Sequence, residues 1–326
     1  DPNVGIVEVP DPRLQKISAL VNPAKLIPTA IEFVDIAGLV AGASKGEGLG
    51  NRFLAHIREV DAIIHVVRAF NDDDITHVSG HVDPISDAGT IETELALADL
   101  ETLERAIERT SKAAKTGDKK VLRELEILKT THEALSNDTQ IAALLTEDEV
   151  IHALKPLCLL TAKPVVYVAN VAENELQGNE KVEALRKHAA EAVAQLVVVS
   201  AAIEQEISEI DPSDRPSFLE DLGLDESGLD KVIRAGYDLL GLQTFFTAGP
   251  KEVRAWTVRR GATAPQAAGE IHTDFERGFI RAETIAYDDF IGLNGEQGAR
   301  EAGRLRLEGK EYVLSDGDIM HFRFNV

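Results

Sequence analysis

Short runs of β-branched and other apolar residues recur along the first 200 residues and predict buried strands. They lie at 31–35, 61–67, 164–169 and 196–200. Runs that are apolar at nearly every position are typical of strands in a parallel sheet that helices cover on both faces. A helical stretch at 180–194 separates the last two runs, as a right-handed crossover requires. The pattern predicts a three-layer α/β domain with a mainly parallel sheet.

The interval between the strands at 61–67 and 164–169 is too long for one crossover and predicts an insertion. Apolar residues recur there at spacings of three, four and seven, first in residues 100–114 and again in residues 121–135. A Gly-containing break at 116–118 separates the two series. Each series is an a/d seam on a charged helix, so we expect an antiparallel hairpin that forms a short coiled coil. The alternative is a hairpin that packs flat on the α/β core, because only about three heptads support the seam.

After about residue 241 the pattern changes to alternating strands with one helix. The predicted strands lie at 244–247, 253–258, 279–285, 312–314 and 320–324, and the helix at 264–271. These elements predict a small C-terminal α+β domain.

Composition excludes several classes of protein. Hydrophobic residues make up 44% of the chain, but no apolar run reaches the ~18 residues that span a bilayer. We therefore expect no membrane partner. The single cysteine, Cys158, excludes an internal disulfide framework. Because the chain also opens without a secretory leader, we expect a cytoplasmic protein.

Charge restricts the partners further. A formal net charge of -22 argues against binding to DNA or RNA by bulk electrostatics, which needs an excess of Lys and Arg. The charge is uneven, however, because residues 243–326 hold 11 Lys and Arg against 13 Asp and Glu. We expect any RNA-facing surface at this end of the chain and no DNA partner.

The motif Asp35-Ile-Ala-Gly38 ends the first predicted strand. In P-loop hydrolases an Asp at this place holds Mg²⁺ through water, and the Gly lets its backbone N–H approach the γ-phosphate. The four residues alone are common in α/β proteins, but five glycines follow within the 13 residues 38–50, counting Gly38. A merely flexible surface loop does not explain their position directly after an Asp-ending strand. The segment predicts a nucleotide-responsive switch loop.

Two further motifs end the last two predicted strands, namely Asn170-Val-Ala-Glu173 and Ser200-Ala-Ala. Ligands of α/β proteins bind outside the carboxyl ends of such strands. GTPases carry Asn-Lys-x-Asp at the first place, where the Asp accepts two hydrogen bonds from guanine. Here Val171 replaces the Lys and Glu173 replaces the Asp, so the sequence does not predict strict guanine selectivity.

These motifs and several other segments make the chain similar to the YchF/Obg-like ATPase family. The similar segments are 1–5, 10–14, 35–52, 170–173, 233–237, 251–257, 261–268, 271–275 and the final Phe-Asn-Val. The resemblance covers essentially the whole chain. It implies an Obg-type nucleotide-binding domain at 1–90 and 156–240, a coiled-coil insertion at 91–155, and a TGS domain, a ubiquitin-like β-grasp module, at 241–326.

The resemblance also implies an activity and partners. It implies a hydrolase that prefers ATP to GTP, uses Mg²⁺ and associates with the large or small ribosomal subunit as a switch in translation or stress regulation. The residues that it assigns to nucleotide binding are Asp35, which also serves the metal, Gly38, Asn170, the Val171 backbone, Glu173, Ser200 and Ala201.

One element of the family pattern is missing. The sequence contains no Gly-x-x-x-x-Gly-Lys-Ser/Thr motif, which in the family carries the phosphate-binding amides, the Lys and the Mg²⁺-binding hydroxyl. We expect it in about 35 residues before Asp1, and we expect the chain by itself to bind nucleotide poorly. The alternative is a non-catalytic ribosome or RNA adaptor in which the motif is truly lost.

Two residues bear on catalysis. Ras-like enzymes orient the attacking water with a Gln after the Asp-x-x-Gly motif, but this chain has Leu39, which cannot hydrogen-bond. The resemblance points to a loop histidine as the substitute, and the matching residue is His77. The alternative for His77 is a solvated residue beside acidic neighbours. His65 lies within a predicted strand and is expected to be structural.

The C-terminal domain carries basic residues interleaved with the aromatic Trp256 and Phe279. The basic residues are Lys251, Arg254, Arg259, Arg260, Arg277, Arg281, Arg304, Arg306 and Arg323. Such side chains hold phosphates and stack on bases, so ribosomal RNA is a candidate partner. The alternative is an ordinary charged surface, because the net charge of this domain is slightly negative.

Overall fold

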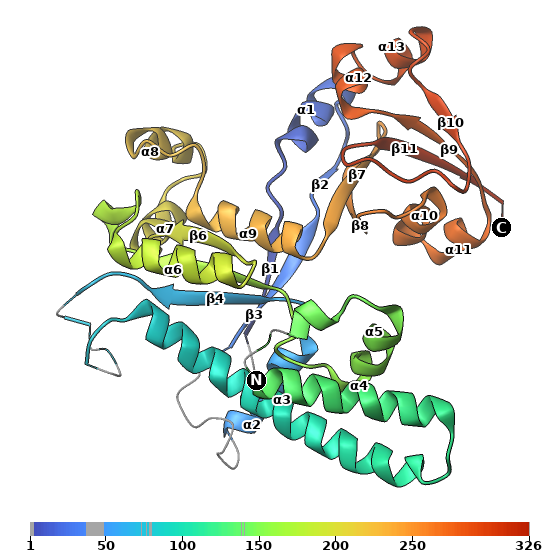
Figure 1. The fold of residues 1–326 in the computed structure, drawn as a ribbon. Coiled ribbons are helices and arrows are strands. Elements are labelled where there is room, and N and C mark those ends of the chain that lie inside the picture. The colour runs from blue at the N-terminus through green and yellow to red at the C-terminus, as the bar shows by residue number, and fades with distance from the viewer. Residues whose placement is uncertain are drawn as a thin grey trace. The chain divides into compact units, whose positions relative to one another are not determined.

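The computed structural model describes residues 3–36, 49–72, 74, 75, 77, 80–137, 139 and 141–325. The chain divides into two compact units, which are treated separately below. Unit 1 comprises residues 1–4 and 34–232, and unit 2 comprises residues 5–33 and 233–326. The chain therefore passes three times from one unit to the other (Figure 1). Within the described ranges, every helix is too short or too polar to cross a lipid bilayer.

A three-stranded parallel sheet forms the core of unit 1, in the order β4, β5, β6 (Figure 1). These strands are β4 (Ile63–Arg68), β5 (Val165–Asn170) and β6 (Gln195–Val199). Ala169 of the central strand pairs with Val67 on one side and Val198 on the other. Residues 166–169 are buried, as expected for a strand covered on both faces. The predicted parallel α/β sheet is confirmed for these strands.

Helices pack around this sheet, and they also form the predicted insertion between β4 and β5. In the described part of unit 1 they are α2 (Leu49–Glu59), α3 (Pro84–Ala114), α4 (Lys119–Ser136), α5 (Asp148–Leu154), α6 (Glu180–Glu191), α7 (Ala201–Glu209), α8 (Arg215–Asp221) and the start of α9 (Gly228–Leu239), with 3₁₀ turns at Ile141–Leu144, Lys155–Leu157 and Glu173–Glu175. The apolar face of α6, with Val182 and Leu185 fully buried, packs against the sheet.

The predicted strand at 31–35 does not join the parallel sheet in the described residues. It forms β3 (Ala30–Asp35), which pairs with β1 (Asn3–Glu8) in a separate two-stranded sheet. Exposed and half-buried positions alternate along most of β3, and Ile31 and Phe33 pack with Tyr237. This alternation is typical of a strand with one covered face, so the prediction of one sheet that includes Asp35 is wrong.

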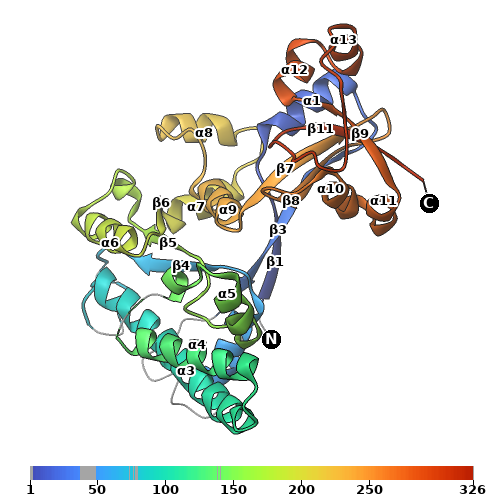
Figure 2. The ribbon, with the colours of Figure 1, turned by 45° about the vertical axis from the view of Figure 1, so that its right-hand side comes forward.

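Helices α3 and α4 form the predicted helical hairpin (Figure 2). Gly117 in the turn has a φ of 78°, a left-handed conformation that glycine adopts without strain. Asp118 then caps α4, because its Oδ1 accepts a hydrogen bond from the Lys120 N–H at 2.8 Å. Leu103 and Leu128 of the two seams are both fully buried. The first turns of α3 pack differently, against the sheet, through the buried Ala88.

Unit 2 contains a six-stranded sheet in the order β10-β9-β11-β7-β8-β2. Its strands are β2 (Leu26–Ile27), β7 (Leu242–Ala248), β8 (Val253–Arg259), β9 (Phe279–Ile285), β10 (Arg306–Glu308) and β11 (Ile319–Phe324), and its helices are α1 (Pro12–Val21), α10 (Ala264–Ile271), α11 (Thr273–Arg277), α12 (Tyr287–Gly292), α13 (Glu296–Glu301) and the end of α9. The small C-terminal α+β domain is confirmed.

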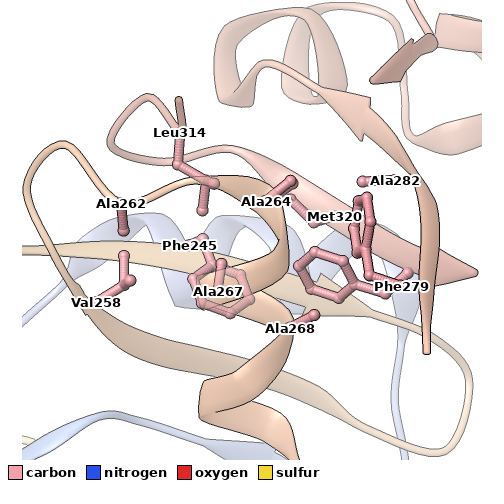
Figure 3. Packing of buried hydrophobic residues seen from close by; sticks show 11 residues of the cluster. Phe245, Val258, Ala262, Ala264, Ala267, Ala268, Phe279, Ala282, Leu314 and Met320 are labelled. Atoms are coloured by element: carbon pink, nitrogen blue, oxygen red, sulfur yellow. The ribbon is translucent and has the colours of Figure 1, made fainter. Parts of the chain in front are cut away.

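The two faces of this sheet carry separate cores, as two adjacent phenylalanines of β7 show. Successive side chains of a strand point to opposite faces, and both Phe245 and Phe246 are fully buried. Phe245 packs with Ala267 and Ala268 of α10 (Figure 3). Phe246 packs on the other face with a cluster that includes Ile17 of α1. Helix α1 therefore packs on the C-terminal sheet, and residues 5–33 cluster with unit 2.

One predicted strand of unit 2 is misplaced. Residues 312–314 form only an isolated bridge between Val313 and Thr263, and the edge strand is β10. The bridge forms because the Leu314 N–H donates to the Ala262 carbonyl and the Ala264 N–H donates to the Tyr312 carbonyl. These bonds fasten the start of α10 instead of extending the sheet.

Candidate functional site

Two of the predicted motifs meet at the carboxyl ends of β5 and β6. Asn170 ends β5 and pairs with Val199 of β6. Its side-chain Oδ1 accepts a hydrogen bond from the Ala201 N–H at 3.0 Å. The bond ties the loop that begins at Asn170 to the first residue of α7. The structure thus brings together Asn170 and Ala201, as the sequence predicts for neighbouring parallel strands.

The residues after Asn170 differ in burial. Val171 is 2% exposed, and its N–H donates to the Val199 carbonyl at 2.8 Å. Glu173 is exposed at the start of a 3₁₀ turn. The side chain of Glu175, not that of Glu173, accepts a hydrogen bond from the Ala172 N–H. The backbone at Val171 is therefore fixed, while the carboxylate of Glu173 faces solvent.

Ser200 offers a further polar group at the same edge. Its side chain is 1% exposed, and within the described part of the chain its Oγ has no hydrogen-bond partner. Buried hydroxyls without a partner are rare, and each needs a specific explanation, such as strain, a catalytic role or a bound water or ion. This orphaned hydroxyl is consistent with a nucleotide site at the ends of β5 and β6.

Asp35 is exposed at the end of β3, and the structure does not place it on the sheet that carries Asn170. An exposed single carboxylate suits Mg²⁺, which proteins bind through one or two carboxylates while water and phosphate oxygens complete its shell. Elsewhere in the described residues, no group of three His, Cys, Asp or Glu side chains is arranged to hold a metal. Gly38 and Leu39 lie outside the described residues.

His77 lies on the loop between β4 and α3. Its Nε2 is 3.0 Å from Asp87 Oδ2 in the first turns of α3, and the His77 side chain is 17% exposed. A carboxylate can only accept in this contact, so Nε2 carries the proton and donates it. His77 is therefore not the freely solvated residue that the sequence left open.

Arg68, which the sequence did not single out, fixes the described part of this loop. Its guanidinium donates to the carbonyls of Phe70, Asp72 and Ile75 at 3.0 to 3.1 Å. The same group lies 4.7 Å from the centre of the Phe70 ring, which adds a cation–π contact. Arg68 is a basic residue at the end of an apolar strand and directly before an acidic loop, and this pattern in the sequence could have identified it.

Asn179 likewise escaped the sequence analysis. Its Nδ2 donates to the Ala69 carbonyl at 2.8 Å, and its Oδ1 accepts from the Val182 N–H at 2.9 Å. The residue caps α6 and also holds the end of β4. An Asn directly before an amphipathic helix is a typical N-cap signal, so its capping role was predictable, whereas its contact with Ala69 was not.

A polar cluster joins β4 and β5 to α3 and α6. Glu92 Oε1 accepts from the Tyr167 hydroxyl at 2.6 Å and lies 2.7 Å from His188 Nε2. Burial lowers the pKa of His65, although the charge of Glu92 opposes the shift. Burial and the bond to Glu92 both raise the pKa of Tyr167. His65 is therefore held neutral at pH 7, as expected for a structural residue.

A second buried cluster joins α2 and α3 to the segment that leads into β5. Asp99 of α3 is fully buried and accepts from the Leu160 and Thr161 N–H groups and the Thr161 hydroxyl at 2.8 to 2.9 Å. Arg58 of α2 lies 3.5 Å from Asp99 and donates to the Cys158 carbonyl at 2.9 Å. Burial raises the pKa of Asp99, while these hydrogen bonds and the Arg58 charge oppose the shift.

Comparison with known sequences places this arrangement in a class. Residues 10–97 match the profile of a family described as 50S ribosome-binding GTPase. Residues 242–325 match the profile of the YchF GTPase C-terminal region, described as a protein of unknown function. These profiles, together with the parallel α/β sheet, define a nucleotide hydrolase.

Whole-chain relatives are more specific. The ribosome-binding ATPase YchF of Bacillus subtilis is 59% identical over 329 residues, which cover all of this chain and 90% of the relative. The protein of the same name from Escherichia coli O157:H7 is 56% identical with the same coverage. The solved YchF GTPase of Schizosaccharomyces pombe has a TM-score of 0.89 at 38% identity and covers 99% of this chain and 88% of its own. The chain belongs to the YchF family.

Proposed function

We propose that this protein is a ribosome-associated nucleotide hydrolase that prefers ATP to GTP and works as a switch in translation or stress regulation. The observation that carries the proposal is the hydrogen bond from the Ala201 N–H to Asn170, which joins the two base-side motifs. The relatives named ribosome-binding ATPases support the activity and the partner. Ribosome association also favours a cytoplasmic location.

The preference for ATP rests on the chemistry of the two bases. Guanine presents adjacent N–H donors that a short, fixed carboxylate binds in a bidentate way, whereas adenine lacks this pair. At this position the chain has Glu173, which is longer than Asp and exposed. Val171, in place of a Lys whose stem would cover the ring, is buried. The site therefore gives guanine little advantage, and Asn170, the Val171 backbone, Ser200 and Ala201 are left to surround adenine.

Replacing Asn170 by Ala should weaken ATP binding about tenfold, because the loss of a hydrogen bond that positions both loops costs roughly 1.5 kcal/mol. Isothermal calorimetry on the full-length protein measures this. Asn174→Ala is the matched control, because Asn174 is an exposed asparagine in the neighbouring turn, and it should bind ATP like the wild type. Tighter binding of GTP than ATP by the wild type would contradict the adenine assignment, and absence of binding to either would favour the adaptor.

For hydrolysis we propose that Asp35 binds the metal ion and that His77 orients the attacking water. Mg²⁺, when bound, supplies charge neutralisation at the phosphates. Asp35 is the described carboxylate at a strand end that the family pattern matches, and Leu39 cannot orient water. His77 has a hydrogen-bonded carboxylate, Asp87, which fixes its imidazole at Nε2. Such a pair fixes the orientation of a histidine ring.

We assign ribosomal RNA contact to β8 of unit 2. The Arg254 guanidinium lies 3.8 Å from the centre of the Trp256 ring, and the Trp256 Nε1–H donates to the Thr247 hydroxyl at 2.9 Å. The Arg254 side chain is thereby held against the face of the Trp256 ring, and the exposed Lys251 lies three residues before it. A fixed cation of this kind suits a phosphate.

Replacing both Lys251 and Arg254 by Ala should weaken ribosome binding several-fold. It should also lower the magnitude of the slope of log affinity against log salt by about one to two, because fewer phosphate contacts form and fewer counterions are released on binding. Co-sedimentation with ribosomes at several salt concentrations measures the slope. Arg300→Ala is the control, because Arg300 pairs with Glu296 within one helix. An unchanged slope in the double variant would remove β8 from the RNA contact.

A further inference from the structure

Helices α7 and α8 and the first turn of α9 enclose an apolar groove on unit 1 (Figures 1 and 2 show the three helices). Its volume is about 290 Å³. The apolar lining comes from all three helices and the loop between the first two, and consists of Ile207, Pro212, Pro216, Leu219 and Leu229. Leu229 is 48% exposed, so a large aliphatic surface faces solvent there. A groove of this size, near the lower end for ligand sites, accommodates a few side chains.

The groove is rigid on its α9 side. Glu204 of α7 accepts from the Gly228 and Leu229 N–H groups at 2.7 and 3.0 Å, and Ser227 Oγ accepts from the Asp230 N–H at 3.0 Å. A Cβ atom at Gly228 would lie 2.9 Å from Val199 and from Glu204, so α9 begins in close contact with α7 and β6. These bonds also occupy the amides at the start of α9, which removes the usual basis for anion binding at a helix N-terminus.

The surroundings of the groove are strongly acidic. Residues 200–232 contain ten Asp and Glu against two Lys and Arg, and Asp230 and Glu204 line the groove itself. The basic residue of the lining, Arg215, donates its Nε–H to the Ile210 carbonyl at 3.2 Å. Such a field attracts cations and repels nucleic acid. A ligand of this groove therefore needs an apolar side chain for the floor, and it needs positive charges around that side chain for the acidic rim.

We propose that this groove binds a basic peptide segment of a partner protein. One aliphatic side chain of the segment occupies the floor beside Ile207, Leu219 and Leu229, and its Lys or Arg residues lie along the acidic rim. The apolar anchor gives affinity, and the opposite charges give rapid association and register. This partner site is separate from the nucleotide contacts at Asn170 and from the RNA contact assigned to unit 2.

Fluorescence anisotropy with the full-length protein tests the proposal. The probe is a short fluorescein-labelled peptide of Lys and Ser with one central leucine, and the control peptide has Ser in place of the leucine. We expect the leucine peptide to bind at least about tenfold more tightly, as burial of an aliphatic side chain predicts. Leu229→Ser should abolish that difference. Asp230→Asn should weaken binding a few-fold and reduce its salt dependence.

Leu222→Ser is the matched control. Leu222 is 38% exposed, follows α8 directly and does not line the groove, so this variant should bind the leucine peptide like the wild type. Thermal unfolding checks that both Leu→Ser variants fold, and the milder Leu229→Ala replaces Leu229→Ser if the latter does not. Equal affinity for both peptides, or unchanged binding by a folded Leu229 variant, would overturn the inference. A single-stranded oligonucleotide that competes with the leucine peptide would show the partner class to be wrong.

Discussion

Replacing Asp99 by Ala is expected to lower the free energy of unfolding by about 3–5 kcal/mol, since one partner of a buried, hydrogen-bonded ion pair is removed. The loss leaves the Leu160 and Thr161 N–H groups buried without an acceptor. Each such group costs about 1–3 kcal/mol. Arg58 also loses its nearest carboxylate, although it keeps the Cys158 carbonyl.

Urea unfolding followed by far-ultraviolet circular dichroism measures this effect, because the long helices of unit 1 dominate that signal. Trp256 is the single tryptophan and lies in unit 2, so its fluorescence reports the other unit in the same titration. Asp99→Asn retains one acceptor oxygen and should lose less than Asp99→Ala. Glu101→Ala, which removes an exposed carboxylate from the same helix, should change the unfolding free energy by less than about 0.5 kcal/mol. A circular dichroism midpoint that is the same for Asp99→Ala and the wild type would refute the role assigned to this cluster.

Replacing His77 by Ala should reduce the rate of ATP hydrolysis about 100-fold or more, with ATP affinity unchanged within about twofold. General acid–base groups contribute about 10²–10⁴ to rates, and His77 is not assigned to nucleotide binding. Single-turnover hydrolysis by the full-length protein separates the chemical step from product release. Turnover and binding that both remain at the wild-type level would remove His77 from the mechanism.

Two further variants separate chemistry from position. Asp87→Asn keeps the shape of the partner but replaces the carboxylate that accepts the His77 Nε2–H. We expect it to lower kcat with little effect on KM. His81→Ala, a second histidine on the same loop, should behave like the wild type. A loss with His81→Ala as large as with His77→Ala would assign the effect to the loop as a whole.

Continuous apolar runs predicted the strands β4, β5 and β6 well. The reason is clearest for the central strand β5, where residues buried on both faces are apolar at nearly every position. The meeting of Asn170 with Ala201 followed from the same logic. The run at 31–35 led to the wrong sheet assignment. Glu32 is exposed between the inward-facing Ile31 and Phe33, and this alternation indicates a strand with one exposed face. Local patterns thus distinguish strand from helix better than they distinguish one sheet from another.

The contacts that position His77 and α1 are not set by local spacing. Asp87, ten residues after His77, meets it only after the chain turns, and no spacing rule announces such a pair. In the same way, Phe245-Phe246 predicts a strand with two covered faces, but it does not say that Ile17 covers one of them. Tertiary packing decides both cases, and the sequence alone leaves several partners equally plausible.

The placement of residues 5–33 in unit 2 has a consequence for protein synthesis. Helix α1 is made before β7, and the β7 residue that covers its apolar side follows roughly 220 residues later, which at about 5–20 residues per second is a delay of roughly 10–45 s. During that interval Leu14 and Ile17, both buried in the finished fold, have no native partner from the C-terminal strands. Unit 2 therefore completes its fold only after its C-terminal strands have been made, when α1 docks onto them.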